Sequence, residues 1–257
     1  MAARYADLAG SGVLVSGGGS GIGAALVEGF ARQGARVAFI DIAVKESRAL
    51  AASLSGTVEH APLFLEADLR DIPALRAAVA EAADALGGLK VLVNNAARDD
   101  RHDFEAIGPE DWDESLAVNL RHYAFAAQAA LPHLRRAAAG TSGAAIVNLS
   151  SIAYLLNMGE LPAYAAAKAG IVGLTKSLAG RLGPENIRVN AILPGMVLTE
   201  RQRQLWVDEA AAAAGVARQC LKRSLGPEDI VGPCLFLASD ASGAVTAQTL
   251  IVDGGML

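Results

Sequence analysis

Ser151, Tyr164 and Lys168 bring a hydroxyl, a phenol and an ammonium together in one short stretch of the chain. Tyr164 and Lys168 are four residues apart in an Ala-rich run, so a helix places both on one face, about 5.4 Å apart along its axis. A phenol with the ordinary pKa of ~10 is a poor base at neutral pH, but a neighbouring cation favours the phenolate and lowers that pKa. We therefore predict that Tyr164 exchanges a proton with a substrate oxygen that Ser151 also contacts. A Tyr and a Lys at this spacing are also common by chance, so the rest of the chain has to support the prediction.

The elements that position these groups alternate between short apolar runs and longer Ala-rich segments. This rhythm predicts an α/β fold with a parallel sheet, doubly wound as in the Rossmann fold, with helices on both faces. Strands are expected to begin at Val13, Val37, Leu63, Val91, Ala145, Arg188 and Thr249. Helices are expected over 22–33, 45–54, 72–86, about 112–139, around Tyr164 to about Leu182, and from near Pro227.

A glycine-rich loop, SGGGSGIG, follows the first expected strand and opens the first expected helix. Glycines let a backbone turn tightly and approach a pyrophosphate, whose charge is then stabilised at the helix N-terminus. Such a loop alone is a weak signal, but its place between a strand and a helix favours dinucleotide binding over a structural turn. The residues expected to bind the cofactor here are Gly17, Ser20, Gly21, Ile22 and Gly23.

Asp41 ends the second expected strand, eighteen residues after Gly23, and indicates which dinucleotide binds. A carboxylate at this place accepts hydrogen bonds from the adenosine ribose hydroxyls and repels a 2′-phosphate. Neither the loop nor positions 42 to 44, beginning with Ile42, contains a basic residue that compensates. The sequence therefore predicts NAD rather than NADP, although Asp41 also suits an acid that caps the next turn.

Two further strand ends carry candidate cofactor contacts. Asp68 could accept a hydrogen bond from the adenine amino group, with Leu69 packed nearby, although Asp68 suits the N-cap of the following helix almost equally well. Asn95, Ala96 and Ala97 end the fourth strand, where small side chains let a cofactor lie close. Asn95 could instead tie neighbouring loops together.

Composition excludes several classes of protein. The chain has 257 residues, of which 53% are hydrophobic and 19% charged, which is typical of a globular protein and not of a disordered one. A net charge of -5 argues against a nucleic-acid partner. Two cysteines and four histidines show no metal-ligand spacing, so no metal is expected. The N-terminus lacks a signal-peptide pattern and no run is long enough to span a membrane, so a cytoplasmic location is expected.

The segment from about 199 to 222 departs from the alternation and suits one or two helices. It follows a strand at the edge where open parallel sheets bind ligands, so we expect it to be a substrate lid. No linker or repeat divides the chain, and a single domain over 1–257 is expected.

Seven ordered pieces along nearly the whole chain together resemble the short-chain dehydrogenase/reductase family. They are SGGGSGIG, Asp41, the Asp68-Leu69 pair, NNAA, Asn119 in AVNL, Ser151 with Tyr164 and Lys168, and LPGMVLT from Leu193. The resemblance implies a single Rossmann domain with seven parallel strands that assembles as a homotetramer or homodimer through its long helices. Two departures are visible: Ser16 stands where the family usually has Thr, and Ala97 where it has Gly, so the backbone at Ala97 should avoid a positive φ.

The resemblance also implies roles for individual residues. Tyr164 would be the general acid/base, Ser151 would polarise the substrate oxygen, and Lys168 would support the phenol and bind the nicotinamide ribose. Asn119 would hold a water in a proton relay from Lys168; otherwise it is a mid-helix polar residue without an obvious purpose. The residues implied around the nicotinamide are Pro194, Gly195, Val197 and Thr199.

The loops that would contact substrate favour a sugar. The run RDDRHDF is polar, which suits several hydroxyls better than an apolar steroid or acyl chain, although a solvated loop fits its composition as well. This run, the segment from Trp112 to His122, and TERQRQLW are similar to bacterial pentose and aldose 1-dehydrogenases of the family, which oxidise an anomeric hydroxyl with NAD. Candidate substrate contacts are Asp100, Arg101, His102, Asn157 and Trp206. The alternatives are a dehydrogenase of another carbonyl, such as a 3-oxoacyl thioester or hydroxysteroid, and a non-catalytic NAD-binding regulatory protein.

Overall fold

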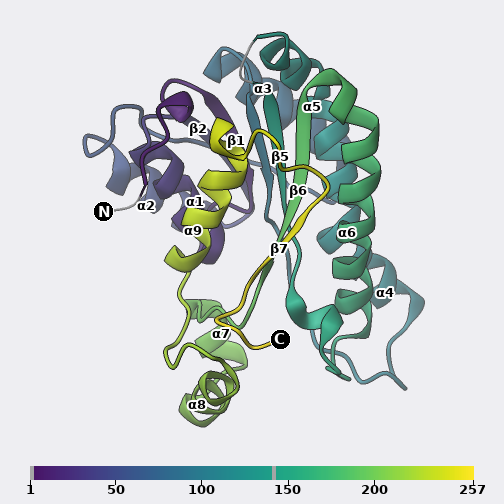
Figure 1. The fold of residues 1–257 in the computed structure, drawn as a ribbon. Helices are drawn as coiled ribbons and strands as arrows, with labels where there is room; N and C mark the ends of the chain where they lie inside the picture. The colour runs from purple at the N-terminus through teal and green to yellow at the C-terminus, as the bar shows by residue number, and fades with distance from the viewer. Residues whose placement is uncertain (1–2, 141–142) are drawn as a thin grey trace.

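The structure is a computed structural model that describes residues 3–140 and 143–257. Within these residues, seven parallel strands form one sheet in the order β3-β2-β1-β4-β5-β6-β7, seen in Figure 1. This confirms the predicted doubly wound parallel sheet. The strands are β1 (Gly12–Ser16), β2 (Arg36–Asp41), β3 (Leu63–Glu66), β4 (Val91–Asn94), β5 (Ala144–Leu149), β6 (Ile187–Pro194) and β7 (Thr249–Val252).

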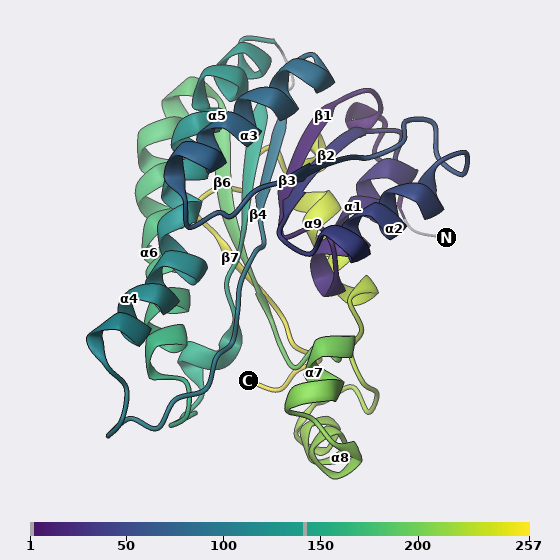
Figure 2. The same cartoon turned by 180° about the vertical axis from the view of Figure 1, so that it is seen from behind.

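Helices cover both faces of the sheet, as Figures 1 and 2 show. One face packs against α1 (Gly21–Arg32), α2 (Val44–Leu54) and α9 (Glu228–Ala238). The other face packs against α3 (Ile72–Leu86), α5 (His122–Ala138) and α6 (Pro162–Leu182). Because both faces are covered, every residue of β1, β4 and β5 is buried, which explains their continuous apolar sequences.

The long helix expected over 112–139 is interrupted. It consists of α4 (Pro109–Leu116), a π-helical turn over Ala117–Arg121, and α5. A π turn inserts one extra residue into the helical ladder, and such turns are frequent at functional sites. The apolar pattern predicted helix throughout because the inserted residue shifts the helical face without removing it.

Two short helices follow β6, α7 (Glu200–Leu205) and α8 (Glu209–Arg218), in the segment expected to form a lid. Figure 1 shows them beyond the end of the sheet, away from the helices that cover its faces. The strands β1 and β4 pair in register, with Ser16 opposite Asn94, so their carboxyl ends and the loops that follow lie side by side. This edge of the sheet positions the candidate site.

Candidate active site

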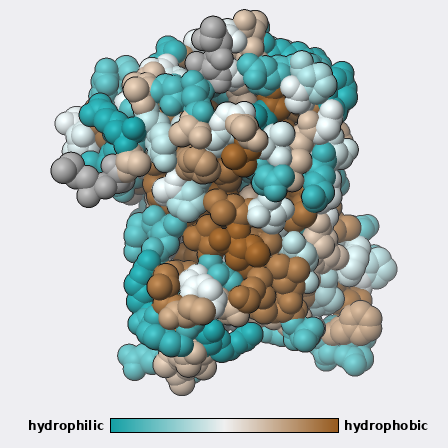
Figure 3. All heavy atoms as spheres, in the orientation of Figure 1, coloured by the Kyte–Doolittle hydropathy of each residue, from teal (hydrophilic) through white to brown (hydrophobic). Residues whose placement is uncertain are grey.

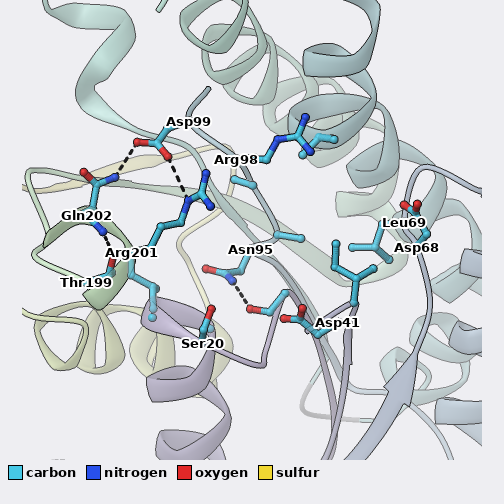
Figure 4. A pocket seen from close by; sticks show the side chains of 18 of the residues that line it. Ser20, Asp41, Asp68, Leu69, Asn95, Arg98, Asp99, Thr199, Arg201 and Gln202 are labelled. Carbon is cyan, nitrogen blue, oxygen red and sulfur yellow. Dashed lines mark hydrogen bonds and ion pairs between the residues drawn. The ribbon is translucent and has the colours of Figure 1, made fainter. Parts of the chain in front are cut away.

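A cleft of about 430 Å³ lies at the carboxyl ends of the central strands, and Figure 4 shows its side chains. It brings together segments that are far apart in the sequence. Its lining includes Gly17, Ser20, Gly21, Ile22, Gly23, Asp41, Ile42, Asp68, Leu69, Asn95, Ala96, Ala97, Tyr164 and Thr199, all of which the sequence singled out. Arg70, Arg98, Asp99, Arg201 and Gln202 also line it.

The glycine-rich loop packs so closely that side chains are excluded at two positions. A Cβ on Gly17, whose φ is +67°, would lie 2.6 Å from the Cα of Ala96. A Cβ on Gly23 would lie 1.8 Å from the carbonyl oxygen of Gly17. The first turn of α1, which begins at Gly21, therefore opens directly on the cleft with backbone N–H groups that have no partner inside the helix. This arrangement fits a pyrophosphate.

Asp41 holds the glycine loop as well as facing the cleft. One carboxylate oxygen accepts from the backbone N–H of Gly19 at 2.8 Å, and the other accepts from Ala43 at 2.9 Å. The turn-capping alternative is therefore realised, but each oxygen keeps a lone pair for a ribose hydroxyl. Ile42 beside it is 65% exposed and offers an apolar surface to a base.

The alternative for Asp68, the N-cap of the following helix, is wrong. Asp71 caps α3, accepting from the N–H of Ala74. Asp68 instead pairs with Arg70, whose hydrogen bond lowers the pKa of the carboxyl group. Arg70 also pairs with Glu114, so its guanidinium is held between two acids at the rim of the cleft.

Asn95 both lines the cleft and ties two loops together. Its side-chain amide donates to the carbonyl oxygens of Ser16 and Gly17, at 3.2 and 2.9 Å. The Ser16 hydroxyl accepts from the backbone N–H groups of Asn95 and Ala96. The only positive φ angles at non-glycine positions among the described residues are at Asn186 and Ala247, so Ala97 avoids that region as expected.

Helix α6 places Tyr164 and Lys168 together, as their spacing predicted. The Lys168 amine lies 5.4 Å from the centre of the Tyr164 ring. It donates to the carbonyl oxygen of Leu149 at 2.9 Å and lies 3.4 Å from the hydroxyl of Tyr123, a fully buried side chain that the sequence did not single out. Ser151, just after β5, is near enough to Tyr164 to lower the pKa of its phenol, and the Ser151 hydroxyl accepts from the backbone N–H of Ala153 at 3.0 Å.

The expected lowering of the phenol pKa by Lys168 is wrong for this structure. Burial of the phenol, and then the negative charge of Asp99, raise the pKa of Tyr164 well above its ordinary value, and the nearby hydroxyl of Ser151 offsets only part of this. Burial also lowers the pKa of Lys168 to about 7. The same low-dielectric surroundings disfavour the phenolate of Tyr164 and the ammonium of Lys168. Lys168 therefore carries less positive charge than an ordinary lysine.

Asn119 has a purpose that does not depend on a bound water. Asn119 lies in the π turn. Its side-chain oxygen accepts from the N–H of Arg98 at 2.8 Å, and its side-chain amide donates to the carbonyl oxygen of Arg98 at 3.0 Å. Asn119 therefore fixes the loop after β4 against the helix. The water relay assigned to it stays a prediction.

The segment after β6 approaches the C-terminal end of the chain. A Cβ on Gly195 would lie 2.6 Å from the Cα of Asp253, while Pro194 ends β6 and Val197 is buried in a bridge to Leu225. Thr199 reaches the cleft and caps α7, its hydroxyl accepting from the N–H of Gln202 at 3.2 Å.

The candidate substrate contacts lie in different places on the protein. Arg101 pairs with Glu160 at 3.1 Å and its guanidinium stacks 4.7 Å from the centre of the Trp206 ring. This joins the loop after β4 to the lid segment. His102 lines a separate shallow hollow, and Asn157 is exposed.

Of two adjacent acids, the one that lines the cleft is Asp99 and not the predicted Asp100. Asp100 pairs with Arg98 and lies 3.8 Å from Arg201. The sequence did not single out Arg98 and Asp99 as cleft residues, since a loop has no periodicity that tells which side chain points inward. Arg201 and Gln202 of α7 also line the cleft without having been singled out.

Among the described residues, no group of three or more His, Cys, Asp or Glu could hold a metal ion. In the same residues, no helix has the length and apolar character needed to cross a membrane.

Comparison with known proteins shows close similarity over nearly the whole chain. A family profile described as Enoyl-(Acyl carrier protein) reductase matches residues 17–257. The "Probable galactose dehydrogenase GalD" of Rhizobium meliloti is 62% identical, over 98% of this chain and 97% of the relative. The D-xylose 1-dehydrogenase of Caulobacter vibrioides is 44% identical, over 98% of both chains.

Solved structures agree with this similarity. A dehydrogenase/reductase from Sinorhizobium meliloti 1021 superposes with a TM-score of 0.90 at 33% identity, covering 98% of this chain and 97% of the other. A short-chain dehydrogenase/reductase from Serratia marcescens gives 0.88 at 35% identity, with coverages of 97% and 99%.

Proposed function

Because the chain belongs to the short-chain dehydrogenase/reductase family, whose members are nicotinamide-dependent oxidoreductases, we propose that it oxidises the anomeric hydroxyl of a cyclic sugar to a lactone with NAD. The observation that carries the proposal is the single cleft in which the glycine-rich loop, Asp41 and Tyr164 meet. The sugar is supported by two relatives named for galactose and xylose oxidation. The polar loop after β4 supports it as well.

The geometry around α6 supports the proposed catalytic roles. Ser151 and Tyr164, which lie near each other, would hold the substrate hydroxyl, and Tyr164 would accept its proton. Lys168, held by Leu149 and Tyr123, lies 5.4 Å from the centre of the Tyr164 ring and would pass a proton to a water that Asn119 holds. The residues of the cleft would hold NAD⁺, which would supply the hydride acceptor and a positive charge that favours the phenolate.

The preference for NAD over NADP rests on the ribose end of the cleft. Asp41 presents a carboxylate where a 2′-phosphate would lie, and repels it. Arg70, a nearby cation of the cleft, is paired with Asp68 and Glu114 and so is poorly suited to compensate.

A screen of NADH formation over pentoses, hexoses, polyols, secondary alcohols, hydroxysteroids and 3-hydroxyacyl thioesters tests the proposal, with NAD and NADP compared in parallel. We expect the highest kcat/KM with an aldose and NAD. Higher kcat/KM with a steroid or thioester would replace the sugar by that substrate. NAD binding without turnover of any substrate would point to a regulatory protein instead.

We also propose that the protein assembles as a homotetramer or homodimer. Figure 3 shows hydrophobic side chains gathered in the middle of one face, over the region of β7. Leu250 and Ile251 of that edge strand are 37% and 43% exposed, and Leu257 is 53% exposed. An apolar patch on an open sheet edge is typical of a protein interface. Light scattering coupled to gel filtration should give two or four times the chain mass of 26.3 kDa; a mass of one chain would contradict the proposal.

A further inference from the structure

Asp99 is an acid of the cleft whose side chain is only 17% exposed. It lies in the loop after β4 and faces the lid helix α7, as Figure 4 shows. One carboxylate oxygen, Oδ2, accepts a hydrogen bond from the side-chain amide of Gln202 at 2.7 Å. The other, Oδ1, lies 3.7 Å from Nε of Arg201, which is an ion-pair distance but longer than a hydrogen bond.

This carboxylate therefore keeps hydrogen-bonding capacity for a ligand. An ionised carboxylate has about four lone-pair sites, and Gln202 occupies one of them. The neighbouring charged side chains are engaged elsewhere: Asp100 pairs with Arg98, and Arg101 pairs with Glu160. Asp99 is thus positioned as an acceptor that remains open toward the cleft.

Asp99 also lies close to the reacting end of the site. It lines the same cleft as Tyr164. Burial dominates the pKa shifts of Tyr164 and Lys168, and the carboxylate of Asp99 raises the pKa of both groups. When a substrate oxygen contacts Tyr164, the neighbouring substituents of that substrate therefore lie near the carboxylate of Asp99.

We propose that Asp99 determines substrate specificity by accepting a hydrogen bond from a sugar hydroxyl other than the one that is oxidised. The inference rests on the proposed function and names the residue that selects polyhydroxylated substrates within it. A partly buried carboxylate left without this hydroxyl loses a charged hydrogen bond, so a deoxy substrate is disfavoured. The contacts of Asp99 with Gln202 and Arg201 also keep the acceptor fixed against the lid segment.

The test compares each preferred aldose with its 2-deoxy, 3-deoxy and 4-deoxy analogues, and for a hexose the 6-deoxy analogue, in the wild type, Asp99→Asn and Asp99→Ala. In the wild type, we expect one analogue to have kcat/KM lower by roughly 10- to 150-fold, the range of a hydrogen bond to a charged group. In both variants this ratio should fall to near one, mainly through KM of the parent sugar. Asp103→Asn, an exposed acid in the same loop, is the matched control and should keep the wild-type ratio.

Thermal unfolding and the affinity for NADH establish that the variants are folded. Asn keeps an oxygen acceptor for Gln202, which favours an intact loop. The inference is overturned if the wild type does not discriminate against any analogue, or if the ratio in Asp99→Asn equals that of the wild type. It is also overturned if Asp103→Asn loses the ratio equally. A wild type that oxidises secondary alcohols or steroids but no sugar refutes the proposed function instead, and is recognised before any variant is made.

Discussion

The side chains of Tyr164 and Lys168 meet in a setting that disfavours charge on both. Lys168 is 1% exposed, with a pKa of about 7, and the pKa of Tyr164 is raised by burial. At neutral pH the phenol therefore holds its proton, and in the proposed mechanism the charge of a bound nicotinamide would help to release it. The proposed proton relay would thus be coupled to cofactor binding.

Tyr164→Phe should keep cofactor affinity while reducing kcat by about 10²- to 10⁴-fold, because only the ionisable hydroxyl is removed. The measurements are steady-state NADH formation and NADH binding by fluorescence. Tyr154→Phe, at a partly exposed tyrosine ten residues earlier, is a control expected to retain turnover. Unchanged kcat in Tyr164→Phe would remove the general acid/base role from this residue.

Replacing Asp41 by Ala together with Ile42→Arg should shift the cofactor preference toward NADP. The change removes the acid that repels a 2′-phosphate and adds a cation beside it. The readout is the ratio of kcat/KM for NAD to that for NADP. Because Asp41 also holds Gly19 and Ala43, the single Ile42→Arg variant serves as a control with the loop contacts intact. A ratio that does not move in the double variant contradicts the ribose assignment.

At the scale of elements, the strands and most helices could be predicted because buried parallel strands are continuous apolar runs and the glycine loop marks the first turn. The π turn could not, since the apolar pattern continues through it; in the structure, Asn119 of this turn accepts from the N–H of Arg98, twenty-one residues earlier. The prediction that Asp100, and not Asp99, faces the cleft was wrong because side-chain direction here also depends on residues far apart in the sequence. Side-chain direction in a loop is fixed by tertiary partners, here Gln202 and Arg201, which lie about a hundred residues farther along the chain.

The helices α7 and α8 should be the least stable elements of the fold. Every residue of α7 and α8 is at least partly exposed, so little apolar burial opposes their local unfolding. Limited trypsin digestion should first cleave at Arg201, Arg203 or Arg218, as identified by mass spectrometry of the fragments. Ligands bound in the cleft should slow this cleavage because Thr199 and Gln202 line it. First cleavage at Arg32 in α1 would contradict this order.

The stability of the whole molecule should depend on His122, a buried residue at the start of α5. Its Nε2 lies 3.1 Å from the carbonyl oxygen of Ala96, and burial lowers its pKa to about 4. Below pH 6.5 the unfolded chain binds a proton that the folded state does not bind until pH 4. The free energy of unfolding should therefore fall as pH decreases from 6.5 to 4, by about 3 kcal/mol from this group.

Urea unfolding of the wild type and His122→Asn measures this contribution between about pH 7.5, one unit above the unfolded pKa, and about pH 4, the folded pKa. The difference between the two proteins should shrink as pH falls. His60→Asn, at a partly exposed histidine, is the control and should parallel the wild type. Parallel curves for the wild type and His122→Asn would show that protonation of His122 does not affect folding.

During synthesis, the glycine-rich loop leaves the ribosome long before Thr199 and Gln202, which line the same cleft. Between them come β4, which pairs with β1, and β5 and β6, which extend the sheet. Ligand binding stabilises only a state that contains the complete site, so the cofactor cannot stabilise an incompletely synthesised chain to any large extent. The nascent chain must therefore fold through its own packing. A dinucleotide can stabilise the protein only after all segments that line the cleft have been synthesised and folded.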